Sequence, residues 1–180
     1  MAPQYLFTSQ RLGFRNWQAG DFEPMAAINA DPVVREFFPG TQTYEETAAF
    51  IGRMQQLMAG KGYCYFAVDE LASGKFIGFI GIADQTFEAL FTPSADIGWR
   101  LAQAYWNQGF ATEGAARCLQ YAFENLHLPT INAIAPVINE KSVRVMEKIG
   151  MKKMQEFDHP LLVNDERLRR CVLYTINATF

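Results

Sequence analysis

The segment Trp106–Glu113 has the residue types that best suit ligand chemistry. It reads WNQGFATE and runs from a predicted strand, through a glycine turn, into a predicted helix. A helix N-terminus offers unpaired backbone N–H groups and a partial positive charge, and Gly109 lets backbone approach a ligand closely. This combination suits a phosphate group, although Gly109 alone also fits an ordinary turn. The segment is neither a P-loop nor a dinucleotide fingerprint, because it lacks Gly-Lys-Ser/Thr and the three-glycine spacing.

Asn139 and Ser142 form a second polar pair, at the start of another predicted helix. Asn is a favoured N-cap, and a serine hydroxyl in the first turn can satisfy a free N–H group. Both side chains can also contact a ligand, Ser142 by donating a hydrogen bond. One residue can fill both roles, so the pattern leaves the structural and the functional interpretation open.

Three other titratable residues favour structural interpretations. Glu113 lies in the first turn of its helix, where a carboxylate suits the helix dipole. His127 lies at a helix end, where it suits the opposite pole of the dipole. His159 precedes a proline in a loop, where it would titrate near neutrality, and we expect it to make a hydrogen bond within that loop.

The elements that must position these residues follow from hydrophobic periodicity and caps. Predicted strands cover residues 10–16, 63–68, 75–82, 95–101, 131–137, 151–157 and 170–176. Predicted helices begin at Asp21, after the Thr43–Glu46 capping box, after Gly109 and at Asn139; the second ends at Gly60, the third near Leu126 and the fourth at Gly150. Helices thus interrupt a sheet that also contains a hairpin, which predicts one α+β (mixed α/β) domain.

Composition excludes several classes of protein. The chain has 180 residues, a net charge of -3 and no Lys/Arg block, which argues against nucleic-acid binding. Its three cysteines are far apart and it has two histidines, so neither a disulfide framework nor a metal site is expected. The N-terminus does not resemble a signal peptide, and no apolar run reaches membrane-spanning length. We therefore expect a soluble, cytoplasmic protein without a membrane partner.

The run IGWRL…YWNQGFATEGA, followed by NEKSVRVMEKIGM, resembles the GNAT superfamily of acetyl-CoA-dependent N-acetyltransferases. The nearer resemblance is to the branch typified by RimJ and RimL, which acetylate ribosomal-protein N-termini. The opening SQRLGFRNWQAGDFEPM, the FDHP segment and the closing LRRCVLY strand resemble the same branch. The resemblance covers residues 9–177. It implies a single GNAT domain whose central mixed β-sheet is flanked by helices and splayed at the Trp99–Leu101 strand.

The resemblance also implies a site for acetyl-CoA, the acetyl donor, without a metal. Its pyrophosphate would lie on the backbone of Asn107, Gln108, Gly109, Phe110, Ala111 and Thr112. Its pantetheine arm would pair with Trp99, Arg100 and Leu101, and Asn139 and Ser142 would lie near the thiol. Trp106 departs from the Gln or Arg of the general family pattern, although RimJ/RimL-like sequences commonly have Trp there.

Catalysis by direct attack needs a base for the amine proton. In several GNAT enzymes a glutamate at the position of Asp96 serves this role; otherwise Asp96 is a surface carboxylate on a strand face. A backbone N–H group on the Trp99–Leu101 strand would stabilise the oxyanion. Met146 stands where many members have a tyrosine acid, and methionine cannot donate a proton. Ser142 would then donate a hydrogen bond to the leaving sulfur.

The expected function is transfer of acetyl to a primary amine, either of a peptide or protein N-terminus or of a small molecule. By resemblance, the acceptor groove would involve Phe37, Phe38, Pro39 and Tyr44, with Tyr63 and Tyr65 opposite. No carboxylate cluster indicates a polycationic acceptor. Two alternatives stay open: a non-catalytic acyl-CoA-binding or regulatory module, and a structural protein that binds no nucleotide. The chain would be a monomer or a homodimer.

Overall fold

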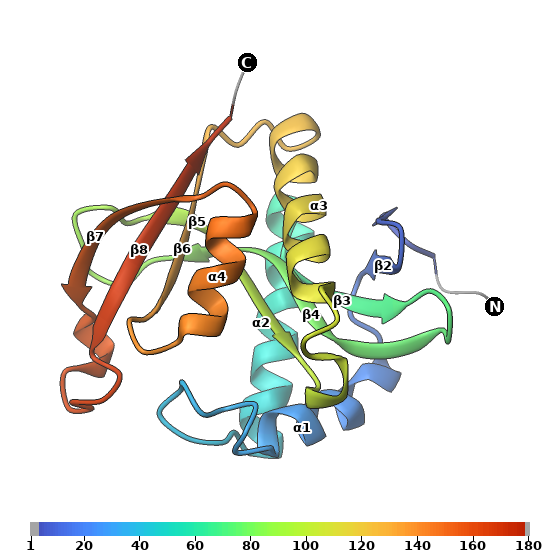
Figure 1. Ribbon diagram of the computed structural model, residues 1–180. Coiled ribbons are helices and arrows are strands. Elements are labelled where there is room, and N and C mark those ends of the chain that lie inside the picture. The colour runs from blue at the N-terminus through green and yellow to red at the C-terminus, as the bar shows by residue number, and fades with distance from the viewer. Residues whose placement is uncertain (1–3, 179–180) are drawn as a thin grey trace.

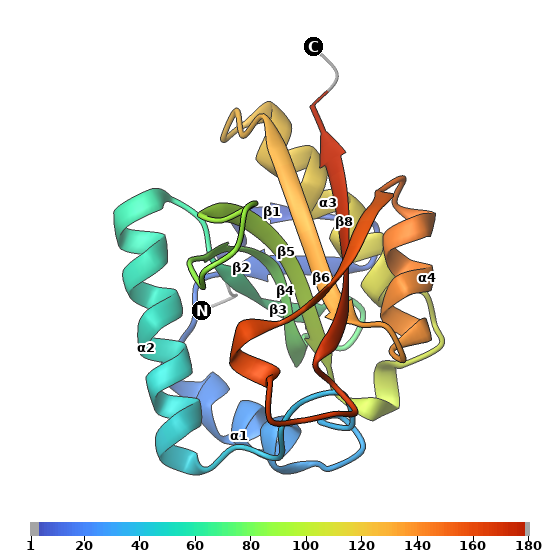
Figure 2. The ribbon, with the colours of Figure 1, turned by 90° about the vertical axis from the view of Figure 1, so that its left-hand side faces the viewer.

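One eight-stranded sheet runs through the molecule and separates two pairs of helices. A computed structural model describes residues 4–178. The strands are β1 (Phe7–Thr8), β2 (Leu12–Arg15), β3 (Tyr65–Glu70), β4 (Lys75–Gln85), β5 (Ser94–Leu101), β6 (Thr130–Pro136), β7 (Lys152–Asp158) and β8 (Arg170–Asn177). The helices are α1 (Phe22–Ala30), α2 (Tyr44–Lys61), α3 (Phe110–Glu124) and α4 (Glu140–Lys148). Figures 1 and 2 show α1 and α2 on one side of the sheet and α3 and α4 on the other.

The sheet opens between β5 and β6. The strand order is β1-β2-β3-β4-β5-β6-β8-β7, and all neighbours are antiparallel except β5 and β6. These two strands run parallel and are in register at one pair of residues, Asp96 opposite Asn132. Within the described residues, the edge of β5 beyond Asp96 therefore has no strand partner. The predicted mixed sheet, splayed at the 99–101 strand, is confirmed.

Strand β4 shows how the helices cover both faces of the sheet. Phe79 faces α2, where its ring centroid lies 5.2 Å from that of Phe50. The next residue, Ile80, faces α3, where only a glycine, Gly114, leaves room for its side chain. Burial on both faces explains why β4 reads as a nearly continuous apolar run rather than an alternating one. The strand continues three residues past the predicted end at Ile82, because β5 pairs with it as far as Gln85.

The predicted starts and ends of the helices agree with the structure to within a few residues. The capping box of α2 is confirmed: Thr43 Oγ1 accepts from Glu46 N at 3.2 Å, and Glu46 Oε2 accepts from Thr43 N at 2.8 Å. The predicted end at Gly60 is wrong, because Gly62 adopts the left-handed conformation (φ 77°) that closes the helix. Asp21 does not cap α1 through its side chain; its carboxylate binds Arg15 instead.

Strand β1 has only two residues, too few for a periodic pattern, and was not predicted. Within residues 4–178, no helix is long and apolar enough to cross a membrane. The same residues contain no group of three or more His, Cys, Asp or Glu side chains arranged to hold a metal ion. All three cysteines are buried and unpaired.

Candidate active site

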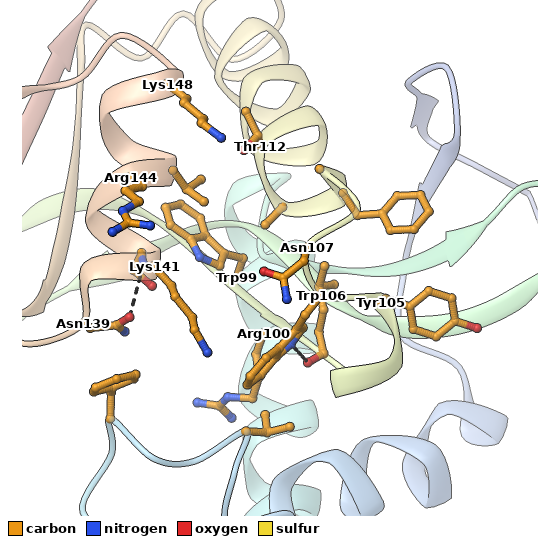
Figure 3. Close-up of a pocket in the computed structure, with 18 of the residues that line it drawn as sticks. Trp99, Arg100, Tyr105, Trp106, Asn107, Thr112, Asn139, Lys141, Arg144 and Lys148 are labelled. Carbon is orange, nitrogen blue, oxygen red and sulfur yellow. Dashed lines mark hydrogen bonds between the residues drawn. The ribbon is translucent and has the colours of Figure 1, made fainter.

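A cavity of about 400 Å³ lies where α3 and α4 begin, beside the open edge of β5. The structure brings together ten of the predicted site residues here: Trp99, Arg100, Leu101, Asn107, Gly109, Phe110, Ala111, Thr112, Asn139 and Ser142. Figure 3 shows the turn and α3 on one side of this cavity and α4 on the other. Tertiary structure therefore assembles three segments that are separate in the sequence.

The turn before α3 has the geometry of an anion site. Asn107 (φ 59°) and Gly109 (φ 81°) are both left-handed, a backbone conformation that recurs in concave turns that bind anions. Gly109 is the N-cap of α3 and has no side chain, so no side chain occupies the N–H groups of the first helical turn. These donors border the cavity and carry the positive end of the helix dipole.

Arg11 holds this turn in place from the other end of the chain. Its Nη1 donates to the Gln108 carbonyl at 3.0 Å, and its guanidinium lies 4.3 Å from the Phe110 ring centroid. Its Nε donates to Glu113 Oε2 at 2.6 Å, and Ser9 Oγ donates to Glu113 Oε1 at 2.7 Å. Burial acts to raise the pKa of Glu113, but the hydrogen bonds from Ser9 and Arg11 outweigh it and lower that pKa. Glu113 is thus structural, as predicted, and its role extends beyond the helix dipole.

Gln108 is the one predicted cofactor-binding residue that does not line the cavity. Its Nε2 donates to the Ala104 carbonyl at 2.8 Å, and its own carbonyl faces Arg11. The side chain closes the preceding turn rather than facing a ligand. Sequence alone could not distinguish a residue that closes the turn from one that faces a ligand, because every residue of such a turn has a backbone N–H group.

Three cations on α4 were missed by the sequence reasoning. Lys141, Arg144 and Lys148 line the cavity, and Lys141 Nζ lies 4.9 Å from the Trp106 ring centroid. Figure 3 shows Lys141 and Lys148 extending from α4 toward the turn and α3. Their spacing of three and four residues places them on one helix face, which is the signal that could have identified them.

Asn139 and Ser142 lie at the junction of this cavity with a second one. The predicted cap is confirmed, since Asn139 Oδ1 accepts from Ser142 N at 3.2 Å. Both residues border both cavities, as do Trp99 and Arg100. The cap leaves the amide nitrogen of Asn139 and the hydroxyl of Ser142 for other partners. Their predicted role near the thiol stays a prediction.

The second cavity, of about 440 Å³, lies between β5 and β6 where the sheet opens. Asp96 is on its wall and is buried, so the interpretation of Asp96 as a surface carboxylate is wrong. Its Oδ2 accepts from the Tyr65 hydroxyl at 2.8 Å and from Gln85 Nε2 at 3.3 Å. Its Oδ1 is buried and accepts no hydrogen bond from the described residues.

Burial raises the pKa of Asp96 to about 7, against the opposing effect of the hydrogen bonds from Tyr65 and Gln85. A carboxylate with such a pKa can exchange a proton near neutral pH. Burial, and then the charge of Asp96, raise the pKa of Tyr65 well above its usual value, so its hydroxyl keeps its proton and donates it in the hydrogen bond. The cavity thus holds a buried, titratable carboxylate with one free oxygen.

Met146 is buried on the wall of the same cavity, so no hydroxyl comes from this position. His159 lies at the rim and makes the predicted loop hydrogen bond, its Nδ1 accepting from Leu161 N at 3.2 Å. Burial lowers the pKa of His159. The imidazole packs on Phe87, with ring centroids 4.3 Å apart.

The predicted acceptor groove is partly correct. Phe37, Phe38, Pro39 and Tyr65 line the second cavity. The two other tyrosines were placed there wrongly. Tyr44 is exposed on α2, where its hydroxyl donates to Glu23 at 3.3 Å, and Tyr63 donates to Asp84 at 2.7 Å outside the cavity. Clustering of aromatic residues in the sequence did not indicate which of them share a face.

Comparisons with known proteins agree with this geometry. Residues 11–152 match the family model described as acetyltransferase (GNAT) domain. An uncharacterised N-acetyltransferase of Bacillus subtilis, YnaD, is 29% identical over 147 residues, which is 81% of this chain and 82% of that protein. A crystal structure of a GNAT-family acetyltransferase from Bacillus anthracis is 27% identical, with a TM-score of 0.79 over 94% of this chain and 96% of its own.

A spermidine N-acetyltransferase from Vibrio cholerae, solved in complex with CoA and spermine, shares the fold. Its TM-score is 0.73 over 93% of this chain and 95% of its own, at 20% identity. These matches do not distinguish the RimJ/RimL-like branch, which stays a prediction.

Proposed function

The chain belongs to the GNAT acetyltransferase family, and we propose that it transfers an acetyl group from acetyl-CoA to a primary amine by direct attack. The observation that carries this proposal is the meeting of two cavities at the open edge of β5. One has phosphate-binding geometry and the other has a buried carboxylate with a free oxygen. The reacting groups of donor and acceptor would meet at the shared wall, beside Trp99, Asn139 and Ser142.

The first cavity suits acetyl-CoA along its length. The N–H groups of the turn and of the first turn of α3 would bind the pyrophosphate. Lys141, Arg144 and Lys148 would add positive charge for the phosphates. The free edge of β5 at Trp99–Leu101 would pair with the amides of the pantetheine arm, as an added strand pairs with a sheet edge.

Asp96 is the proposed base in the second cavity. The lone pair of the neutral amine attacks the thioester carbon and forms the N–C bond. The amine proton passes to Asp96 Oδ1, directly or through water, the C–S bond breaks, and the thiolate of CoA leaves with the bonding pair. A pKa of about 7 lets Asp96 be ionised before attack and hold the proton afterwards.

The remaining stabilisation would come from the junction of the cavities. A backbone N–H group on the Trp99–Leu101 strand would stabilise the oxyanion of the tetrahedral intermediate. The departing thiolate has the basicity of an ordinary thiol, with a free pKa of about 8.5, and therefore leaves without obligatory protonation. The Ser142 hydroxyl would donate a hydrogen bond to this sulfur in place of the acid that Met146 cannot supply.

The alternative of a non-catalytic acyl-CoA-binding module is less well supported. Burying a carboxylate with an unpartnered oxygen destabilises a fold, and a module that only binds its ligand gains nothing from Asp96. A catalyst gains a base poised near neutral pH. The geometry therefore favours the enzyme.

Two measurements on the full chain test the proposal. A thermal melt with acetyl-CoA at about 100 times its Kd should show stabilisation of about 2.7 kcal/mol. An assay of free thiol release with a panel of peptide and small-molecule amines should then show amine-dependent turnover. Stabilisation without turnover on any amine would favour the non-catalytic module, and a folded protein without stabilisation would contradict the donor site.

A further inference from the structure

The buried Arg15 and the half-buried Arg100 differ in how their charges are balanced. Arg15 is buried and fully neutralised: its guanidinium forms salt bridges of 2.7 Å with Asp21 and of 2.7 Å with Asp69. This arrangement offsets the large unfavourable free energy of removing a charge from water. It shows how this fold holds an arginine whose role is structural.

Arg100 has no such counter-ion. Its Nη1 donates to two neutral oxygens, Asn29 Oδ1 at 2.7 Å and Gln42 Oε1 at 3.4 Å. Its Nε is buried and has no hydrogen-bond partner among the described residues. Burial, and then the charge of Arg35, lower the pKa of Arg100 to about 9, so the guanidinium still carries its charge at neutral pH.

The surroundings hold Arg100 in place without neutralising it. Asn29 is fully buried in α1, and its Nδ2 donates to the buried Thr47 of α2 at 3.1 Å. The guanidinium also lies over two aromatic rings, 4.4 Å from the centroid of Phe38 and 5.2 Å from that of Phe79. The side chain is therefore preorganised by neutral groups, which leaves its charge available to a ligand.

A second cation, the buried Arg35, adds to this unbalanced charge. Arg35 lies on the Phe38 ring at 4.2 Å from its centroid, and its Nε donates to the Gly40 carbonyl at 2.7 Å. No carboxylate of the described residues comes within salt-bridge distance of either Arg35 or Arg100. Burial lowers the pKa of Arg35, and the negative charge of the exposed Glu46 partly offsets this lowering.

Arg100 lines both cavities, including the one proposed for the acceptor. It shares one face of β5 with Asp96 and Gly98, because alternate residues of a strand point the same way. Gly98 lies between Asp96 and Arg100 under the Tyr65 ring, which leaves no room for a side chain at that position. Among the described residues lining the second cavity, Asp96 is the only carboxylate.

Resting on the proposed function, we infer that the acceptor amine belongs to a molecule that also carries a carboxylate, and that Arg100 binds this carboxylate. A guanidinium matches a carboxylate with two parallel hydrogen bonds, and the free Nε supplies one of them. The Cα atoms of Asp96 and Arg100 are about 13 Å apart along the strand. An amino acid, or the first residue of an acidic peptide, would lie in the second cavity, which both residues line, with its amine toward Asp96 and its carboxylate toward Arg100.

The same charge distribution argues against a polyamine acceptor. A polyamine carries several ammonium groups, and at Arg100 these would meet a like charge without carboxylates to offset it. The chain thus shares its fold with a spermidine N-acetyltransferase, but the positive charge of Arg100 disfavours a polyamine acceptor here.

The test compares acceptors that differ only in the carboxylate. Amino acids and their α-carboxamides form one set, and peptides beginning with Asp or Asn form the other, which separates an α-carboxylate from a side-chain carboxylate. For the preferred set, kcat/KM of the wild type should be about 10- to 100-fold higher for the acid, the range expected for a charged hydrogen bond. Arg100→Gln should abolish this preference, and Arg53→Gln, at an exposed arginine on α2, should leave it unchanged.

The outcomes separate this inference from the proposed function. Equal or better turnover of the amides or of polyamines by the wild type would overturn the inference while supporting acetyl transfer. If Arg100→Gln lowers kcat/KM equally for acids and amides, the inference is likewise overturned while acetyl transfer is supported. If this variant does not fold, Arg100→Lys, which keeps the charge but not the two parallel donors, should reduce the preference.

If no amine is turned over, the proposed function fails, and the binding of carboxylates decides the inference. Thermal melts with coenzyme A and N-acetylglutamate, and with N-acetylglutamine amide as the neutral counterpart, then provide the readout. A shift that requires the carboxylate and Arg100 supports the inference, and its absence overturns it.

Discussion

The Tyr65 hydroxyl donates a 2.8 Å hydrogen bond to Oδ2 of Asp96, while the other carboxylate oxygen, Oδ1, is buried and has no hydrogen-bond partner among the described residues. The two residues come from β3 and β5, which are not neighbours in the sheet. A buried carboxylate held on one side by a phenol is therefore available on its other side for a single proton.

Replacement of Asp96 by Asn should reduce kcat without changing the affinity for acetyl-CoA. General base catalysis contributes about 10²- to 10⁴-fold, and an amide cannot accept the amine proton. Steady-state kinetics and acetyl-CoA titration measure the two effects separately. Asp158→Asn, an exposed carboxylate on β7, is the matched control. A rate and pH profile equal to those of the wild type would show that the base lies elsewhere.

Replacement of Tyr65 by Phe should shift the pH-rate profile toward higher pH. In the wild type, kcat/KM should increase as pH rises toward about 7, because Asp96 must be ionised. The hydrogen bond from Tyr65 lowers the pKa of Asp96, so its loss raises that pKa. Tyr63→Phe removes a hydroxyl bonded to Asp84 outside the cavity and should leave the profile unchanged. A profile of Tyr65→Phe identical to that of the wild type would separate Tyr65 from the base.

Asp96 should also make the stability of the protein depend on pH. Its pKa is about 7 in the folded state against 3.8 for the ordinary group. Because the folded state binds the proton more tightly, Asp96 favours folding most below about pH 4, and this contribution is lost as pH rises through 7. The full span corresponds to on the order of 4 kcal/mol.

Denaturant unfolding of wild type and Asp96→Asn between pH 4 and 8 measures this dependence. Asn does not titrate, so the variant should gain stability relative to the wild type as pH rises across that interval. Asp158→Asn again provides the control for removal of a charge. A difference between wild type and Asp96→Asn that stays constant with pH would contradict the raised pKa.

Replacement of Gly109 by Val should abolish acetyl-CoA binding. The left-handed conformation of Gly109 (φ 81°) strains any β-branched residue, and a Cβ there would lie 3.4 Å from Nη2 of Arg11, which holds the proposed phosphate turn in place. Gly74→Val is the matched control, because Gly74 (φ 66°) has the same kind of conformation in the turn between β3 and β4, away from both cavities. Calorimetric titration should show loss of binding in the first variant only. Unchanged affinity in Gly109→Val would refute the phosphate turn.

Charge reversal on α4 should weaken the binding of acetyl-CoA. Lys148→Glu places a negative charge in the cavity that would hold the phosphates, and we expect roughly a tenfold higher Kd at low salt. Added salt should reduce the difference, because the interaction is between exposed charges. Lys75→Glu, an equal change at the far hairpin, should leave Kd unchanged. Equal effects of both variants would indicate a non-specific effect of net charge.

Features that depend on neighbours in the sequence were predictable. The capping box of Thr43 and Glu46, the Asn139 cap and the strand–turn–helix around Gly109 each involve residues within a few positions of one another. Caps and left-handed turns are local because their hydrogen bonds close within one helical turn. The sequence was therefore sufficient to place the glycine turn before α3, the polar pair at the start of α4 and the strand that carries Asp96.

The pKa values and counter-ions of the charged site residues were decided by tertiary structure alone. The carboxylate of Asp96 gains its raised pKa from burial between strands, beside Tyr65, 31 residues away. Arg100 is placed by Asn29, 71 residues away, and it is the absence of a carboxylate there that distinguishes it from Arg15. Desolvation and counter-ions depend on every group packed nearby, and those groups come from distant parts of the chain. For this reason the sequence indicated which residues form the candidate site, while the three-dimensional packing decided the charge that the site presents.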